Sequence, residues 1–251
     1  MEKYNTALFK YLLFIADNSL ILGHRLSEWC GHGPSLETDI ALTNIALDLV
    51  GHARSYYQYA AELNRTTEDD LAYLRDVRDF RNLLLLEQPN GNFADTIARQ
   101  FFFDAFNYLF TTELCKSKDE QIASIAQKAL KEVAYHYRFS AEWVIRLGDG
   151  TAESKEKMQM AINNCWPFTD EMFASDAFDE EMSRAEIGVD LSSIQSLWMQ
   201  RVQEVIKEAQ LTLPEKAWMH KGGKKGIHSE HLGFILADMQ WMQRAYPGME
   251  W

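Results

Sequence analysis

The 251-residue chain carries 25 basic and 37 acidic side chains, a formal net charge of −12, and 47% of its residues are hydrophobic. A chain of this length and apolar content can bury a substantial core. An acidic surface repels nucleic acids and anionic lipids, so the charge argues against both as partners. The cysteines Cys30, Cys115 and Cys165 are scattered and form no paired motif, which is typical of reduced thiols in a cytosolic protein.

The apolar stretch at residues 8–16 does not have the pattern of a signal peptide. Lys10 interrupts it, Asp17 follows it, and no small-residue cleavage site comes after it. No stretch approaches the roughly 20 apolar residues that a membrane span needs. We therefore expect a soluble, cytoplasmic protein.

Four long segments have apolar residues at helical spacing, and glycine and proline are concentrated in the links between them. These segments cover residues 8–29, 35–63, 92–115 and 117–148. Ser35 and Asn92 are good N-cap residues for the second and third helices. Ser117 and Glu120 have the spacing of a capping box and predict the start of the fourth helix.

The rest of the chain contains shorter predicted elements. We expect a short helical segment that includes the leucine run 83–86, a helix at 191–209, and a last helix at 229–246. Four long helices with a longer middle connection indicate an all-α, ferritin-like four-helix bundle. We interpret the chain as a single domain, with the core bundle in residues 1–150 and a helical extension in residues 151–251.

Two histidines occupy positions that resemble those of a di-iron site. Ferritin-like di-iron proteins place Glu-x-x-His on each of two helices and a glutamate on each of the other two. His52 and His136 lie on the apolar stripes of the second and fourth segments, but Leu49 and Val133 stand where the ligand glutamates would be. Neither aliphatic side chain binds iron, so we predict vestigial metal-site positions, Asp104 included, with no metal.

Two other interpretations of these positions stay open. Asp48 and Glu132 lie four residues before the histidines, a spacing that also shares a helix face, and Asp17 and Asp104 could add carboxylates to a degenerate di-metal site. Alternatively, both histidines and Asp104 hydrogen-bond to one another inside the bundle, since buried polar groups need partners.

Two basic clusters suggest anion binding. Arg75, Arg78 and Arg81 could hold the phosphates of a CoA thioester, with Asp76 beside them, or could form ion pairs with Asp76 and Asp79. The second cluster is either a solvated surface or a contact for an acidic partner or a phosphorylated ligand. Its members are Lys216, His220, Lys221, Lys224, Lys225 and His228.

Several sequence runs resemble the C subunits of bacterial phenylacetyl-CoA epoxidases. They read NIALDLVGHAR at residues 44–54, KEVAYH at 131–136 leading to EWVIRLGDGT at 142–151, and GIHSEHLG at 226–233 continuing to the C-terminal EW. The resemblance covers essentially the whole chain. It implies a ferritin-like fold and a place in the multicomponent monooxygenase that epoxidises the ring of phenylacetyl-CoA in aerobic phenylacetate breakdown.

The resemblance also implies how the work is divided in such a complex. A homologous A subunit holds the di-iron centre, and a separate reductase with FAD and an iron–sulfur cluster supplies electrons. This chain would carry no cofactor, would support the A subunit structurally, and would contact the CoA part of the substrate. Two other functions stay open: a CoA-thioester binding protein, or a di-iron oxidase or oxygenase in its own right, using Asp48, His52, Asp104, Glu132 and His136.

A supporting subunit needs an apolar surface for its partner. The run Phe101–Phe103 and the pair Tyr56–Tyr57 place aromatic residues on more than one face of their helices, which is too many for one core stripe. We therefore predict that these aromatic residues form the docking faces.

Overall fold

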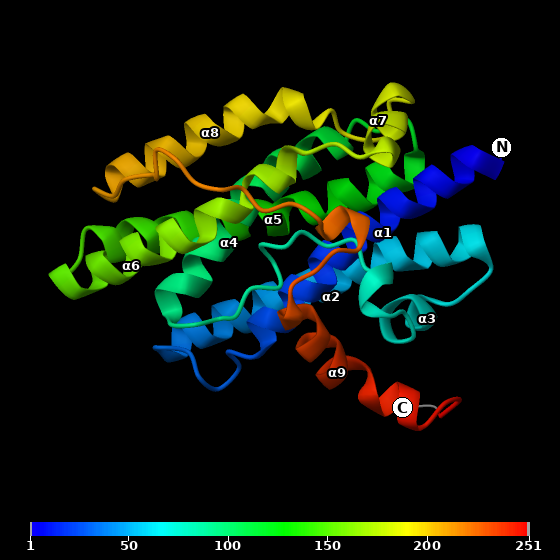
Figure 1. Cartoon of the computed structure of the whole chain (residues 1–251), viewed down its shortest axis with the longest axis horizontal. Helices are drawn as coiled ribbons and strands as arrows, with labels where there is room; N and C mark the ends of the chain where they lie inside the picture. Colours follow the sequence, from blue (N-terminus) through cyan, green and yellow to red (C-terminus); the bar gives the residue numbers. More distant parts are fainter. Residues whose placement is uncertain (1, 250–251) are drawn as a thin grey trace. The chain divides into compact units, whose positions relative to one another are not determined.

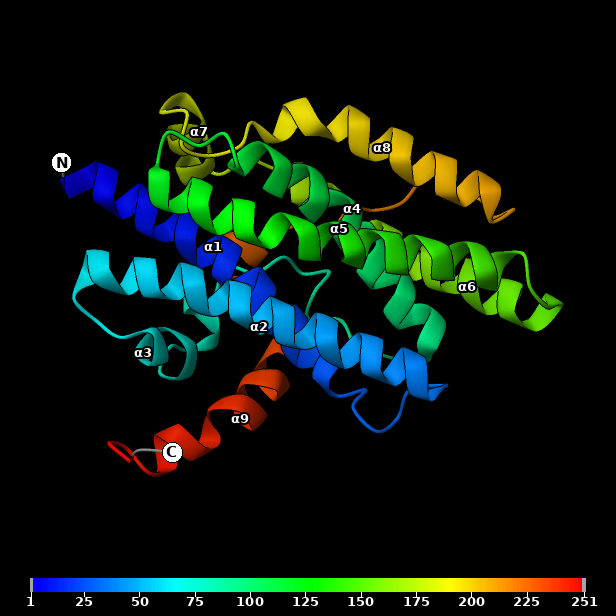
Figure 2. The same cartoon turned by 180° about the vertical axis from the view of Figure 1, so that it is seen from behind.

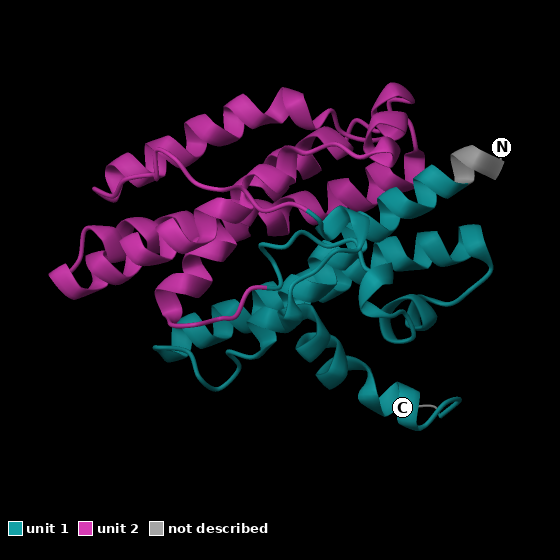
Figure 3. Ribbon diagram, viewed as in Figure 1, with its two compact units in different colours: residues 1–87, 222–251 teal, residues 88–221 magenta. Residues whose placement is uncertain are grey.

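The computed structural model describes the backbone of residues 2–249 and the side chains of residues 6–249 (Figure 1). Within this range every regular element is a helix. The chain forms two compact units, Met1–Glu87 with Gly222–Trp251, and Gln88–Lys221 (Figure 3). Glu250 and Trp251, the end of the last sequence run discussed above, lie outside the described residues.

Two long helices form the body of the first unit. They are α1 (Glu2–Ser27) and α2 (Leu36–Asn64), which lie side by side (Figures 1 and 2). Ser35 caps α2 as predicted, since its side chain accepts a hydrogen bond from the Thr38 N–H. The helices approach closely at Gly23, where an added Cβ would lie 3.2 Å from Val50 Cγ2. Gly23 therefore allows this close packing of α1 on α2.

Helix α1 is apolar around most of its circumference, and residues 11–22 are all buried. By length and composition the segment Thr6–Ser27 could also cross a membrane, so the expectation that no stretch approaches such a length was wrong for this helix. In the protein, 83% of its most apolar window is buried. The core helix of a folded domain has the same combination of length, apolar composition and burial.

Shorter elements complete the first unit: α3 (Glu68–Tyr73), the 3-10 turns η1 (Val77–Asp79) and η4 (Gly223–Lys225), and α9 (Glu230–Ala245). The leucine run 83–86 lies in buried turns, so the helix predicted there was wrong. Side chains of α1 hold this segment instead: Leu83 N–H donates to Asn18 Oδ1 at 2.8 Å, and Arg25 Nη2 donates to Glu87 O at 2.8 Å. Helix α9 is one residue shorter at each end than the predicted helix at 229–246.

The second unit is built on α4 (Phe93–Leu114) and α5 (Glu120–Gly148). Asn92 caps α4 as predicted, within a capping box. The cap of α5 is Asp119 rather than Ser117, because the Asp119 carboxylate accepts the N–H groups at the helix start, while Ser117 Oγ donates to Ile187 O at 2.8 Å. The other elements are α6 (Ala152–Cys165), η2 (Trp166–Phe168), η3 (Asp170–Phe173), α7 (Ala177–Arg184) and α8 (Leu191–Glu208).

The all-α class and the four long helices agree with the predicted ferritin-like fold. Each unit contains one of the two long helix pairs, α1 with α2 and α4 with α5. The units divide after Glu87 and after Lys221, and not at residue 150. The interpretation as a single domain with a core in residues 1–150 stays a prediction.

Gly223 provides a test of how the first unit is assembled. An added Cβ there would collide with the backbone oxygen of Asn82, so Gly223→Ala should lower the free energy of unfolding by about 1–3 kcal/mol. Gly233→Ala is the control, because no atom lies within 4 Å of its added Cβ and alanine favours the helix by up to about 1 kcal/mol. Urea denaturation of both variants measures this, and equal stability of the two would contradict the close approach at Gly223.

Candidate functional site

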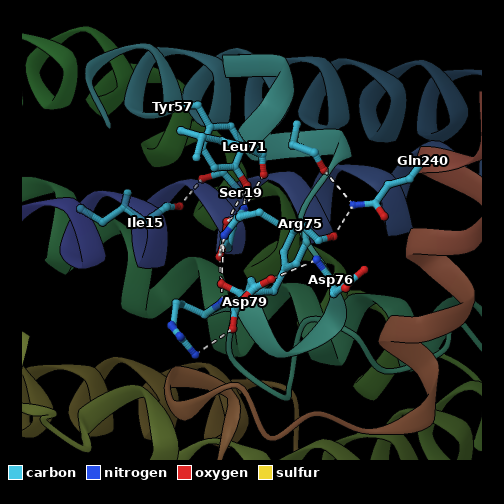
Figure 4. Close-up of polar contacts among 12 residues, drawn as sticks. Ile15, Ser19, Tyr57, Leu71, Arg75, Asp76, Asp79 and Gln240 are labelled. Carbon is cyan, nitrogen blue, oxygen red and sulfur yellow. Dashed lines mark hydrogen bonds and ion pairs between the residues drawn. The ribbon is translucent and has the colours of Figure 1, made fainter. Parts of the chain in front are cut away.

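Asp17 of α1 is the centre of a buried hydrogen-bond network in the first unit. Figure 4 labels Tyr57 and Arg75, whose side chains belong to this network. Its Oδ1 accepts from Tyr57 Oη and from Arg75 Nη2, both at 2.5 Å. Its Oδ2 accepts from Arg75 Nη1 at 3.1 Å and from the backbone N–H of Arg81 at 2.7 Å. Four donors therefore satisfy one buried carboxylate, as a buried charge requires.

The guanidinium of Arg75 is nearly enclosed by this network. It lies over the Phe80 ring, 4.1 Å from the ring centroid, and Arg75 Nη1 also donates to Asp79 O at 3.1 Å. Burial opposes the charge of Arg75, but Asp17 and Tyr57 hold its pKa above the ordinary value. Burial, followed by the Asp17 charge, raises the pKa of Tyr57 well above its usual range. The network therefore pairs the Arg75 guanidinium with the Asp17 carboxylate inside the first unit.

The candidate CoA contacts have different surroundings in the structure. Arg75 forms its ion pair with Asp17, and neither with Asp76 nor with the Asp79 carboxylate as the pairing alternative expected. Asp76 is exposed and pairs with Arg244 of α9 at 3.0 Å. Arg78 is exposed, whereas Arg81 is half-buried and donates from Nη1 to Arg78 O at 3.2 Å. Of the three arginines, only Arg78 and Arg81 have guanidiniums outside the Asp17 network.

The positions expected to be vestigial metal sites are buried in both units. Leu49 and His52 are buried on α2 in the first unit, and Val133 and His136 are buried on α5 in the second. Asp48 and Glu132, the alternative ligands, are both half-buried. The aliphatic side chains of Leu49 and Val133 contribute no donor atom to their surroundings.

Asp104 of α4 is fully buried in the second unit. Its Oδ1 accepts from Gln100 Nε2 at 2.7 Å. Burial raises the pKa of Asp104 to about 7, against the opposing effects of His136, Ser140 and Gln100. Asp104 and His136 therefore interact electrostatically inside this unit, and Asp104 titrates near neutral pH.

These residues do not fit a di-iron centre. Among the described residues, no group of three or more His, Cys, Asp or Glu side chains is arranged to hold a metal ion. The side chains of Leu49 and Val133 offer no ligand atom, and the carboxylate of Asp17 is already bound by Arg75, Tyr57 and a backbone N–H. A metal would have to displace an internal ion pair to reach Asp17.

The predicted basic cluster is partly buried. The Lys224 ammonium lies over the Phe14 ring, 4.5 Å from its centroid. The His228 ring is buried, with Nδ1 3.0 Å from Glu87 Oε2 and Nε2 3.0 Å from Phe80 O. Lys224 and His228 therefore connect the segment before α9 to the core of the first unit.

Other members of this cluster have partners in the second unit. Lys221 forms an ion pair with Asp170 at 2.7 Å, and the His220 ring stacks on Phe168 with centroids 4.6 Å apart. The prediction of one basic surface over residues 216–228 was therefore wrong for Lys224 and His228, whereas the other four members are exposed. The signal that distinguishes Lys224 from its exposed neighbour Lys225 is its place beside Gly223, where the chain packs tightly.

The predicted aromatic docking faces were also wrong. Phe101–Phe103 and Tyr56–Tyr57 are all buried, because α4 and α2 are covered on more than one side. The large exposed apolar side chains of the first unit lie elsewhere: on α2, at Leu74 after α3, and near or on α9. They include Leu36, Ile40, Leu47, Val50, Ile227, Phe234, Trp241, Met242, Tyr246 and Met249.

The role of Arg75 can be tested with a matched pair of variants. Arg75→Met keeps the aliphatic stem but leaves the Asp17 charge buried without its cation, so it should cost about 3–5 kcal/mol of unfolding free energy. Arg78→Met at the exposed neighbour should change stability by less than about 0.5 kcal/mol. Chemical denaturation measures both, and equal losses would show that Arg75 is not the partner of a buried charge.

Asp104 predicts a pH dependence of stability. Its pKa is raised to about 7 from 3.8, so the folded state binds the proton more tightly, and stability falls as pH rises between these values. Asp104→Asn should remove this loss, which amounts to a few kcal/mol since each pKa unit is about 1.4 kcal/mol. Urea denaturation from pH 4 to 8 compares the variant with wild type and with the exposed control Asp238→Asn. Parallel curves for Asp104→Asn and wild type would refute the assignment.

Comparison with known proteins identifies the family of this chain. A family model described as phenylacetic acid catabolic protein matches residues 1–251. The chain is 52% identical over 242 residues to the C subunit of 1,2-phenylacetyl-CoA epoxidase from Escherichia coli (strain K12), with 96% of this chain and 98% of that protein covered. It is 25% identical over 139 residues to the A subunit of the same enzyme and organism, with 55% of this chain and 45% of that protein covered.

The resemblance expected from the sequence runs is thereby confirmed over nearly the whole chain. The weaker match to the A subunit indicates that the two kinds of subunit are related. This chain belongs to the phenylacetic acid catabolic protein family.

Proposed function

We propose that this chain is the non-catalytic C-type subunit of a 1,2-phenylacetyl-CoA epoxidase and that it supports a homologous, catalytic A-type subunit. The observation that carries the proposal is the match to the C subunit of the Escherichia coli enzyme at 52% identity over nearly the full length of both proteins. The proposal places the chain in the cytoplasm, in aerobic phenylacetate catabolism.

The side chains of the present structure support the non-catalytic part of the proposal. Buried Leu49 and Val133 stand at two positions where a di-iron protein of this fold needs carboxylates. Asp17 is bound on both oxygens by donors from within the chain. A network satisfied in this way stabilises the helices and has no free carboxylate oxygen to offer a metal.

The proposal assigns the redox groups to other subunits. A di-iron centre in the A-type subunit would supply oxygen activation, and FAD and an iron–sulfur cluster in a reductase would supply electrons. This chain would contribute a folded surface that keeps the A-type subunit in its active form. The exposed apolar side chains on α2 and α9 would form part of such a surface.

Contact with the CoA part of the substrate is a second component of the proposal. Arg78 and Arg81 are the candidates, since Arg75 is bound to Asp17 and Asp76 to Arg244. A guanidinium binds phosphate oxygens in a bidentate fashion, which suits the phosphates of CoA. The contact would form only in the complex, where the A-type subunit holds the acyl end of the substrate.

The proposal is tested by purifying the chain from iron-replete cells, alone and co-expressed with the A-type subunit of the same organism. We expect no stoichiometric iron in the chain alone, co-elution with the A-type subunit, and epoxidation of phenylacetyl-CoA only when both subunits and a reductase are present. About two irons per isolated chain, lost in a His136→Ala variant, would instead support a di-iron enzyme. Failure to co-elute would remove the supporting role.

A further inference from the structure

An apolar stripe on α2 is exposed to solvent within the part of the chain that the structure describes. Leu36, Ile40, Leu47 and Val50 are between 41% and 72% exposed. Single exposed leucines are ordinary on protein surfaces, but a continuous row on one helix face marks an interaction site. The row is therefore the feature that needs an explanation.

The spacing of this row indicates what kind of element covers it. With the half-buried Thr43 included, successive residues are separated by 4, 3, 4 and 3 positions. This is the spacing of a helix seam that packs against another helix by knobs-into-holes contacts. From Leu36 to Val50 the seam runs about 21 Å along the axis, which matches a facing helix of four turns.

Helix α2 has a different stripe for its own core. Leu42, Ile45 and Leu49 are fully buried, and α2 packs through its buried residues against α1. Val50, at the end of the seam, also approaches Gly23 of α1, but the rest of the seam lies on another side of the helix. The sequence therefore keeps a second apolar face on α2 that the fold of the first unit leaves exposed.

Charged residues beside the seam restrict the partner. Between residues 36 and 50 the only charged side chains are Glu37, Asp39 and Asp48. Hydrogen bonds from the backbone N–H of Gly33 and its neighbours lower the pKa of Asp39, so this carboxylate is ionised at neutral pH. A second copy would bring acidic flanks against acidic flanks, whereas a helix with lysine or arginine beside its apolar stripe is complementary.

We propose that the α2 seam (Leu36, Ile40, Thr43, Leu47 and Val50) is the docking surface for an amphipathic helix of the homologous A-type subunit, flanked there by basic residues. The inference rests on the proposed function and adds the face that makes the contact. Relatedness to the A subunit of the Escherichia coli enzyme favours this occupant, since related chains can pair through equivalent helix faces in a pseudo-twofold arrangement.

The test uses Leu47→Glu and Ile40→Glu, which place a charge in the centre of the seam at exposed positions. Each should raise the dissociation constant for the purified A-type subunit more than about tenfold, the loss expected at the centre of an interface. The control is Leu197→Glu on α8, an exposed leucine on a helix of the other unit. The melting temperatures of all variants should stay close to that of wild type, because the replaced side chains are not in the core.

A charge test adds independent evidence. Asp48→Lys should also weaken the complex, and the effect should shrink at high salt, since the flank is expected to face basic residues. Normal binding by both seam variants, with the wild-type chain binding the A-type subunit, would overturn the inference while leaving the proposed function intact. Absence of binding by the wild-type chain would instead overturn the proposed function.

Size-exclusion chromatography with light scattering distinguishes the A-type subunit from a second copy of this chain as the partner that covers the seam. If the chain alone forms a dimer that Leu47→Glu converts to a monomer, while binding of the A-type subunit is unchanged, the seam binds a second copy and the inference is wrong. If the same variant loses the A-type subunit, the seam is its docking surface.

Discussion

The buried ion pair between Asp17 and Arg75 is the interaction on which the first unit depends. Asp17 lies in the middle of α1, where an ionised carboxylate without partners would be strongly destabilising. Tyr57 from α2, Arg75 after α3 and the backbone of Arg81 all donate to it. A buried pair of this kind contributes little net stability over apolar residues, but it is costly to break. The ion pair thereby determines that α2 and the segment after α3 pack against α1.

The segment that carries Arg75 also contacts α9. The backbone oxygen of Arg75 accepts hydrogen bonds from Gln240 and Arg244 of α9, at 3.1 and 2.9 Å. At the other end of the segment, Glu87 accepts from Ser229 N–H at 2.6 Å and lies 3.0 Å from His228 Nδ1. Residues 80–87 have no regular structure, so side chains must satisfy their backbone and polar groups. Two polar clusters thus join the C-terminal segment to the N-terminal helices.

This organisation explains which features the sequence could predict. Helical periodicity and caps are local signals, so the four long helices and α9 were found, with Ser35 and Asn92 as caps. The Asp17–Arg75 pair joins residues 58 positions apart, and no local pattern contains that information. The same limit applies to Phe102, which looked surplus to one core stripe but packs beside Trp198, whose Nε1 donates to Phe102 O at 3.0 Å.

The buried polar groups and the exposed apolar residues of α2 both bear on the function of the chain. A catalytic metal site needs carboxylates held ready for an ion, which leaves polar groups unsatisfied and costs stability. In this chain Leu49 and Val133 carry no polar atoms in their side chains, and Asp17 is satisfied by internal donors. Buried Asp104 retains part of that cost, because its Oδ2 has no hydrogen-bond partner among the described residues. The exposed apolar seam of α2 is a cost of a different kind, because it favours self-association unless a partner covers it. An exposed apolar row of this kind on a helix is typical of a surface that binds another protein.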